Sequence, residues 1–227
     1  MTICRPTLSY DELSRDEVLR YAGMRSNGKA SFPVELVDEA MENVIIYASP
    51  VVSFEKYDYN CSTQNIKADG ENIHIESRMA GRHLEGSDEI ICLALTLGRE
   101  IDEMITKSFD DGKYAEGLLM DAAATDAVEV AAAKVEQPIE QMAKAKGYKL
   151  RWRYSPGYGD WPIDAQRDMM RLTHAESIGI SLSESMMLEP SKSITAVIGL
   201  AKGDVEHDIR RGCAGCGKVD CISRRVN

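Results

Sequence analysis

The sequence lacks the long apolar segments and the phosphate-binding motifs that define several large protein classes. No apolar run approaches the roughly 18–20 residues that cross a bilayer, and the opening MTICRPTLSYDELSRDE has no apolar signal-peptide core. GxGxxG after a strand, GxxxxGK(S/T), GxSxG and HExxH are all absent. We therefore expect a cytoplasmic protein with no membrane contact and none of the common nucleotide-binding or hydrolase sites.

Basic residues are scarce as well. The 227 residues contain 27 Lys and Arg against 37 Asp and Glu, a formal charge of −10. Because binding to nucleic acid needs a basic surface, this balance argues against a nucleic-acid partner. From Lys202 onward, six basic residues outnumber four acidic ones, so this end carries +2 and residues 1–201 carry −12. We therefore predict a separate tail over residues 204–227.

Hydrophobic periodicity predicts interleaved helices and strands. Apolar residues at helical spacing predict helices over 9–25, 33–48, 99–113, 114–147 and 164–173. Alternating or continuous apolar runs predict strands over 51–60, 89–98, 149–155, 178–185 and 193–201, with a hairpin over 66–76. Pro138 predicts a kink or break near Gln137. Since regular βαβ alternation is missing, the expected class is α+β, with a mixed or antiparallel twisted sheet packed with helices.

The segment RWRYSPGYGDWP is the most unusual stretch of the chain. Strict alternation over 149–155 would place Arg151 and Arg153 on one strand face. These arginines lead into a Pro-Gly loop that contains Ser155, Gly157 and Tyr158, and a guanidinium is the planar partner that a carboxylate prefers. From the residues alone, a surface turn with two solvated arginines is the simpler interpretation, because most loops only connect elements.

An Ala-rich helix precedes this segment and contains Glu129, with Asp126 three residues earlier on the same predicted face. The small residues around this pair would let a ligand approach closely. One interpretation is a carboxylate presented to a cationic ligand. The alternative is a solvated stripe of the helix, since Asp and Glu are mostly exposed.

The tail contains three of the six cysteines, in the order Cys213, Cys216 and Cys221 within CAGCGKVDC. A Cys-x-x-Cys pair brings two thiolates onto one tight turn, and a third cysteine follows closely. This spacing predicts a zinc ion or an iron–sulfur cluster as alternatives. The further alternative is a disordered tail with reduced thiols.

Five stretches resemble the activation (reactivation) domain of cobalamin-dependent methionine synthase. They are TLGREIDEMI, LLMDAAATDAVE, RWRYSPGYGDWPIDAQ, IGISLSESMMLEP and KSITAVIGL, between about Leu93 and Leu200. The chain looks most similar to free-standing proteins of this type, which also end in a cysteine cluster. The resemblance implies an activation-domain-like core over 89–203, with 1–88 as the N-terminal helical and β-hairpin part of the same α+β domain.

The resemblance also implies a ligand site for S-adenosylmethionine in a groove of that core. Arg153 would pair with the ligand carboxylate, and the loop with Ser155, Gly157 and Tyr158 would contact the ligand. Glu129 would face the ligand amino group. No residue of this chain is expected to be catalytic, because the family holds the methyl donor above a corrinoid.

The function implied is that of a reactivation subunit. It would support reductive methylation of cob(II)alamin on a corrinoid-binding methyltransferase partner such as methionine synthase, with electrons from a donor protein. The partner would carry the cobalamin, since the chain has no D-x-H-x-x-G motif. Two other hypotheses stay open at this point. One is a metal or iron–sulfur redox protein that acts through the tail, and the other is a scaffold that docks on a corrinoid protein without chemistry.

Overall fold

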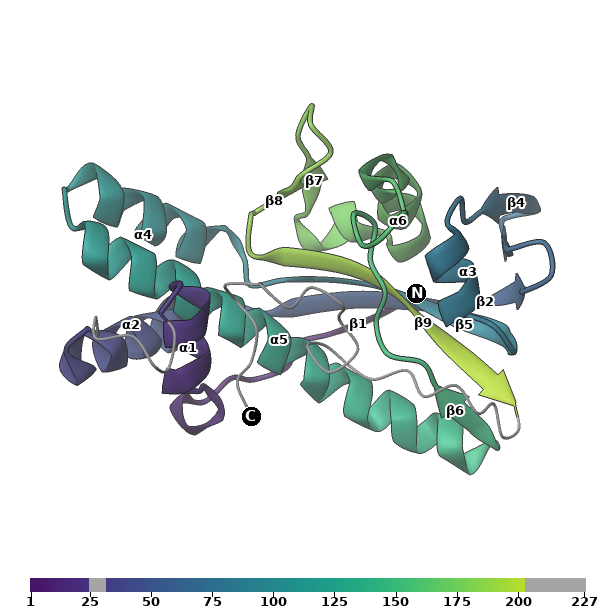
Figure 1. The fold of residues 1–227 in the computed structure, drawn as a ribbon, viewed down its shortest axis with the longest axis horizontal. Coiled ribbons are helices and arrows are strands. Elements are labelled where there is room, and N and C mark those ends of the chain that lie inside the picture. Colours follow the sequence, from purple (N-terminus) through teal and green to yellow (C-terminus); the bar gives the residue numbers. More distant parts are fainter. Residues whose placement is uncertain (25–31, 203–227) are drawn as a thin grey trace.

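A curved antiparallel sheet forms the centre of the structure, a computed structural model that describes residues 1–24 and 32–202 (Figure 1). Its seven strands are β1 (Thr2–Cys4), β2 (Val51–Asn60), β3 (Asn65–Ala68), β4 (Glu71–His74), β5 (Ser87–Thr96), β6 (Tyr148–Leu150) and β9 (Ser193–Lys202). They lie in the order β4-β3-β2-β5-β9-β6, with β1 paired to β2. A separate two-stranded sheet joins β7 (Ser181–Leu182) to β8 (Leu188–Glu189).

Helices cover both faces of this sheet (Figure 1). We call the side covered by α1 (Arg15–Tyr21), α2 (Val34–Tyr47), α4 (Arg99–Asp110) and α5 (Tyr114–Ala145) the helical face. The loop face carries α3 (Arg78–His83), α6 (Gln166–Thr173) and the connecting residues 151–162. Short 3₁₀ helices are η1 (Tyr10–Glu12), η2 (Ile163–Ala165) and η3 (Ala175–Ile178). The predicted α+β class is confirmed, and none of the described helices is long and apolar enough to cross a membrane.

Alternating side chains of β5 explain its continuous apolar sequence. Ile91, Leu93 and Leu95 pack into the core under the helical face, whereas Ile90 and Cys92 pack into the core under the loop face. Because both faces are covered, a strand at this position needs apolar residues in both directions. The predicted buried strand and the buried Cys92 are therefore confirmed.

β2 and β5 join the first part of the chain to the rest. They pair antiparallel from Val51↔Thr96 to Asp58↔Glu89. The predicted boundary at residues 88 and 89 falls inside β5. The first 88 residues and the residues that follow consequently share one sheet and one helical-face core.

Small side chains let α5 lie close to the helical face of the sheet. Several of its alanines have no exposed surface: Ala123, Ala124, Ala127, Ala131 and Ala132. A stripe of alanines on one side allows the helix axis to approach its neighbours, which include α1, α2 and α4. The Ala-rich sequence of this helix is thus a packing feature.

Of the kink or break predicted at Pro138, the break is wrong, because α5 continues through this residue to Ala145. A proline inside a helix removes one backbone hydrogen bond and costs about 3 kcal/mol in an isolated helix. Here Val135 and Ile139, on either side of Pro138, are buried in the helical-face core. Their burial offsets the local cost, so tertiary packing decides the length of the helix.

Candidate functional site

The chain between β6 and α6 is where the predicted site residues lie. The predicted strand over 149–155 is wrong beyond Leu150, where β6 ends, and Tyr154 makes only an isolated bridge with Val197. Without a continuous ladder, side chains need not alternate strictly. Leu150 packs on the helical-face core, whereas Trp152 and Tyr154 pack on the loop-face core.

As a result Arg151 and Arg153 do not share a face, which corrects the prediction from alternation. Arg151 is buried, and its Nη2 donates a hydrogen bond to the carbonyl of Glu85 at 2.9 Å. Burial lowers the pKa of this guanidinium. Arg153 instead reaches α5 on the helical face. Arg153 is therefore the arginine that pairs with carboxylates of the Ala-rich helix, α5.

Arg153 lies between two carboxylates of α5. Its Nη2 donates to Glu129 Oε2 at 2.8 Å, and its Nε lies 2.6 Å from Glu136 Oε1. The Arg153 side chain is only 19% exposed. Its third nitrogen, Nη1, is buried and forms no hydrogen bond with any residue that the structure describes. Within the described part of the chain, the guanidinium is thus held along the Nε and Nη2 side, and its Nη1 donor is not satisfied.

The helix repeat explains why both carboxylates reach the same guanidinium. Glu129 and Glu136 are seven residues apart, which is about two turns and places them on one helix face. The Glu129 side chain is 46% exposed, and that of Glu136 is 18% exposed. Sequence reasoning found Glu129 but missed Glu136, although the spacing of seven residues was a signal for it.

Asp126 does not join Glu129 at this site. It is buried, and its Oδ2 accepts a hydrogen bond from the backbone N–H of Ser14 at 2.8 Å. Ser14 is the N-cap residue of α1. The prediction that Asp126 presents a carboxylate beside Glu129 is therefore corrected: Asp126 attaches α1 to α5.

The loop after Arg153 is a tight double turn. The carbonyl of Ser155 accepts from the N–H of Tyr158 at 3.1 Å, and the N–H of Gly157 donates to the carbonyl of Trp161 at 2.8 Å. Gly159 has φ of 58°, and a Cβ there would lie 2.5 Å from the hydroxyl of Tyr154. Only glycine fits this position, because both the backbone and the close approach exclude a side chain.

Asp160 fastens this loop to the start of α3, a role that sequence reasoning missed. Its carboxylate accepts hydrogen bonds from the hydroxyl of Ser77 and from the backbone N–H groups of Arg78 and Met79, the latter two at 3.1 Å. These bonds hold the pKa of Asp160 below its usual range, first through Ser77 and then through the backbone donors. The loop therefore has a fixed position relative to α3.

Tyr158, in the loop after Arg153, lies close enough to the Arg153–Glu129 ion pair for both charges to act on its hydroxyl. Its side chain is 55% exposed and packs edge-to-face on Tyr154, with ring centres 6.0 Å apart. The pKa of Tyr158 is raised by burial of its hydroxyl and by the negative charge of Glu129, while Arg153 acts in the opposite direction. Tyr21 of α1 also has a raised pKa, first from burial and then from Glu129.

The structure therefore brings together Glu129, Arg153 and Tyr158, and places Ser155 and Gly157 in the adjoining turns. It presents a guanidinium whose buried Nη1 has no hydrogen-bond partner among residues 1–24 and 32–202, an accessible carboxylate and an aromatic ring. Such an arrangement suits a ligand that carries both a carboxylate and a cationic group.

The predicted metal ligands Cys213, Cys216 and Cys221 lie outside the described residues. Within residues 1–24 and 32–202, no group of three or more His, Cys, Asp or Glu side chains could hold a metal ion. Cys4, Cys61 and Cys92 are free thiols there. A metal site in the tail stays a prediction.

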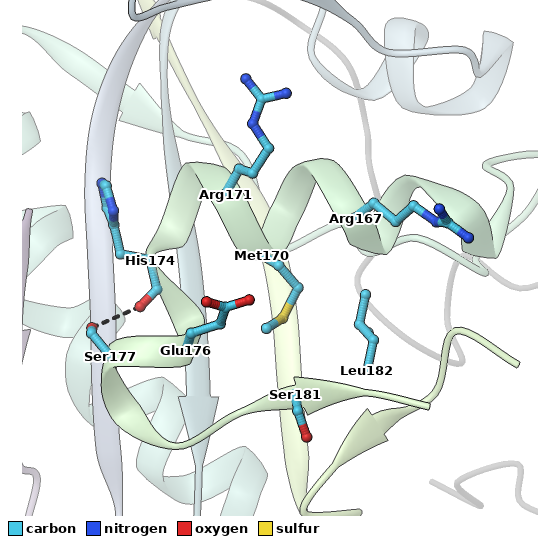
Figure 2. A pocket seen from close by; sticks show the side chains of 8 residues that line it. All are labelled: Arg167, Met170, Arg171, His174, Glu176, Ser177, Ser181 and Leu182. Atoms are coloured by element: carbon cyan, nitrogen blue, oxygen red, sulfur yellow. Dashed lines mark hydrogen bonds between the residues drawn. The ribbon is translucent and has the colours of Figure 1, made fainter. Parts of the chain in front are cut away.

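A separate cavity of about 630 Å³ lies between α6, η3 and β7. Its lining residues are Arg167, Met170, Arg171, His174, Glu176, Ser177, Ser181 and Leu182. Figure 2 shows Arg171 pointing away from Met170 and Leu182, and Arg171 pairs with Glu71 at 3.0 Å while His174 pairs with Glu55 at 3.1 Å. Because the side chains of Arg171 and His174 diverge towards different carboxylates, this cavity is a weaker candidate than the Arg153 site.

Comparison with known proteins supports the fold. No protein-family model and no curated protein sequence matches the chain. A solved structure described as "Crystal Structure of the MetH Reactivation Domain bound to AdoHcy" is similar, with a TM-score of 0.60 and 12% sequence identity. The alignment covers 91% of this chain and 81% of that one. The chain thus has the α+β fold of that reactivation domain, as its sequence resemblance predicted.

Proposed function

We propose that this chain binds S-adenosylmethionine beside Arg153 and acts as a reactivation subunit. It would support reductive methylation of cob(II)alamin on a partner corrinoid methyltransferase such as methionine synthase. The observation that carries the proposal is the buried Nη1 of Arg153, which has no hydrogen-bond partner among the described residues and belongs to a guanidinium paired with Glu129. The similar fold of a domain solved with AdoHcy supports the same ligand class.

The free nitrogen of Arg153 fits the carboxylate of the ligand. A buried donor without a partner costs about 1–3 kcal/mol, and a ligand carboxylate at Nη1 would remove that cost. Since Nη2 and Nε already contact Glu129 and Glu136, the edge at Nη1 is the one left for a ligand. Glu129 is the more exposed carboxylate and would accept the ligand ammonium group.

Tyr158 and the turns before it would orient the rest of the ligand. The exposed ring of Tyr158 can lie against a sulfonium group through a cation–π contact. Asp160 attaches this loop to the start of α3 through hydrogen bonds to backbone N–H groups. The Tyr158 ring and the Arg153 guanidinium would therefore keep their relative positions. These residues bind and orient the methyl donor, and no side chain is assigned a proton transfer.

The corrinoid carried by the partner would supply the redox chemistry and would accept the methyl group. This chain would hold the donor so that its methyl group faces the corrinoid. The electron would come from a separate donor protein. We further propose that residues 1–88 and 89–203 act as one unit and that residues 204–227 form a distinct tail.

Calorimetric titration with S-adenosylmethionine tests the ligand. Replacing Arg153 by Ala should weaken binding about 10- to 100-fold, the worth of a lost charged hydrogen bond. Arg171→Ala is the matched control, because it removes an exposed arginine that pairs with Glu71 elsewhere on the surface. Equal binding by wild type and Arg153→Ala, or no binding by the wild type, would overturn the proposal.

The partner is tested separately. The full chain, immobilised and mixed with a purified cobalamin-loaded methionine synthase, should retain that protein when S-adenosylmethionine is present. If the chain binds S-adenosylmethionine but retains no corrinoid protein, the reactivation role is overturned, and the ligand-binding site stands.

A further inference from the structure

A cavity of about 440 Å³ lies between α3 and the turn that joins β2 to β3. Cys61 and Ser62 line it from the turn, and Arg78 and Arg82 line it from the helix. Because Arg78 and Arg82 are four residues apart, they lie on one face of α3. Two guanidinium groups and a hydroxyl group therefore border the same space.

The charges of these two arginines are not balanced by neighbouring carboxylates. Within residues 1–24 and 32–202, neither Arg78 nor Arg82 forms an ion pair, although four other arginines there do: Arg15, Arg20, Arg153 and Arg171. The whole chain has a formal charge of −10, so carboxylates are abundant. Guanidinium groups that pair with no carboxylate of the described chain keep their donors available for an anionic ligand.

Gln64 holds the turn against α3. With its side-chain nitrogen facing them, it donates hydrogen bonds to the carbonyls of Ile75 at 2.8 Å and Ser77 at 3.1 Å. Its backbone has φ of 54°, a left-handed conformation that residues with a side chain rarely adopt. A Cβ at Gly81 would overlap the Gln64 amide, so only glycine admits this side chain beside the helix. The two walls of the cavity are therefore joined at a fixed distance.

We propose that this cavity binds the phosphate group of a small phosphate ester, held by Arg78, Arg82 and the hydroxyl of Ser62. A phosphate group has several oxygen atoms in a tetrahedral arrangement, so it can accept from two guanidinium groups and a hydroxyl at the same time. A carboxylate has its oxygens in one plane and is satisfied by a single guanidinium. The volume falls within the range of about 300–1,000 Å³ for small-molecule sites, which favours an ester over the bare ion.

Glu85 limits where the phosphate group can lie. It also lines the cavity, just beyond the end of α3, and its negative charge acts on the Arg151 guanidinium. Because a carboxylate repels a phosphate group, the phosphate would lie between Arg78 and Arg82 and away from Glu85. The other end of the ester, with hydroxyl or ammonium donors, would face Glu85.

Calorimetric titration of the full chain with glycerol phosphate tests the site, with acetate as the carboxylate comparison. The wild type should bind glycerol phosphate more tightly than acetate. Arg82→Ala should weaken glycerol phosphate about 10- to 100-fold, through the loss of charge-assisted hydrogen bonds. Arg82→Lys keeps the charge without the planar fork and should weaken it less. The control is Arg99→Ala at the start of α4, an exposed arginine that lines neither this cavity nor the one beside α6.

Cys61 supplies a local readout. It is an exposed free thiol that lines the same cavity. Bound glycerol phosphate should therefore slow the alkylation of Cys61 by iodoacetamide, measured by mass spectrometry of the peptide that contains it. The same protection should be absent in Arg82→Ala.

The outcomes that overturn the site are distinct from those that overturn the methyl-donor site. The phosphate site is wrong if the wild type does not bind glycerol phosphate, if Arg99→Ala weakens it as much as Arg82→Ala, or if binding leaves Cys61 unprotected. A loss of glycerol phosphate binding in Arg153→Ala would place the phosphate at Arg153 and would also overturn it. Thermal unfolding shows whether each variant is folded, and Arg82→Lys supplies the comparison if Arg82→Ala is not.

Discussion

The two faces of the sheet are built by different means. On the helical face, long helices bury continuous apolar stripes, and alanines of α5 without exposed surface let that helix approach closely. The loop face is covered by short helices and by residues 151–162. In the described part of the chain, four buried polar atoms on the loop-face side have no hydrogen-bond partner: Tyr59 Oη, Ser87 Oγ, Arg151 Nε and Trp152 Nε1.

The candidate site combines side chains from a helix of the helical face with side chains from the loop over residues 151–162. α5 supplies Glu129 and Glu136 from a well-packed helix, whereas Arg153 and Tyr158 come from the loop that Asp160 fastens to α3. Stability should therefore depend mainly on the helical face, and ligand geometry mainly on the loop. Variants that affect one property without the other test this division.

The largest effect is expected from Leu119→Ala on α5. Leu119 has no exposed surface in the helical-face core, and such a truncation costs about 2–5 kcal/mol of unfolding free energy. S-adenosylmethionine affinity of the folded fraction should stay within about twofold, because the helix and its carboxylates remain in place. Leu118→Ala, at the neighbouring 37% exposed position, should cost less than about 0.5 kcal/mol.

Urea unfolding measures the first quantity and calorimetry the second. A loss of affinity in Leu119→Ala as large as that in Arg153→Ala would show that the helical face also sets ligand geometry, and the division between the two faces would be wrong.

Compared with Leu119→Ala, Gly159→Ala is expected to lose less unfolding free energy but more S-adenosylmethionine affinity. The added Cβ would meet the hydroxyl of Tyr154 at 2.5 Å and the sulfur of Met79 at 2.6 Å, at a φ of 58°. We expect about 1–3 kcal/mol of destabilisation together with a displaced loop and weakened ligand binding. Gly112→Ala is the control, with φ of 76° and no heavy atom within 4 Å of the new Cβ; it should cost about 1 kcal/mol and leave ligand affinity intact.

The smallest effect is a pH dependence of the loop face. His83 is buried against Trp152, and its Nε2 lies 2.6 Å from the carbonyl of that residue. Burial lowers the pKa of His83 below its ordinary value. The unfolded chain then takes up a proton first, near pH 6.5, so stability is complete above about pH 6.5 and declines as the pH falls below it.

Thermal unfolding between pH 7.5 and 5.5 measures this decline, and His83→Gln should make the profile flatter because it removes the titrating group. A wild-type profile with no slope, or an equal slope in His83→Gln, would remove His83 as its cause. Asp160, whose pKa is lowered, contributes stability that is lost only at lower pH, below about 3.9.

Much of the fold was predictable because the longest apolar patterns are local signals of buried helices and strands. The continuous apolar run from Glu89 to Gly98 indicated a buried strand, and the Asp69–Gly70 turn predicted the β3–β4 hairpin. The break at Pro138 was wrong, since the propensity of one residue was outweighed by burial of its neighbours. The site was predictable in part: Glu129, Arg153 and Tyr158 came together, but Glu136 and Asp160 were missed.

The misses share a physical cause. Asp160 acts on backbone N–H groups about eighty residues earlier in the chain, and a turn residue shows no sign of such a partner in its own sequence. Arg151 and Arg153 face opposite sides because β6 ends early, and the length of a pairing ladder depends on the strand beside it.

By itself the sequence determined the alternation of apolar residues, and hence the helices, the central strands and the α+β class, because burial periodicity is a local property of the chain. Only the tertiary structure decided which charges meet. The contact of Arg153 with two carboxylates two turns apart on α5 depends on how a loop crosses a helix, and that crossing is set by packing between segments distant in sequence.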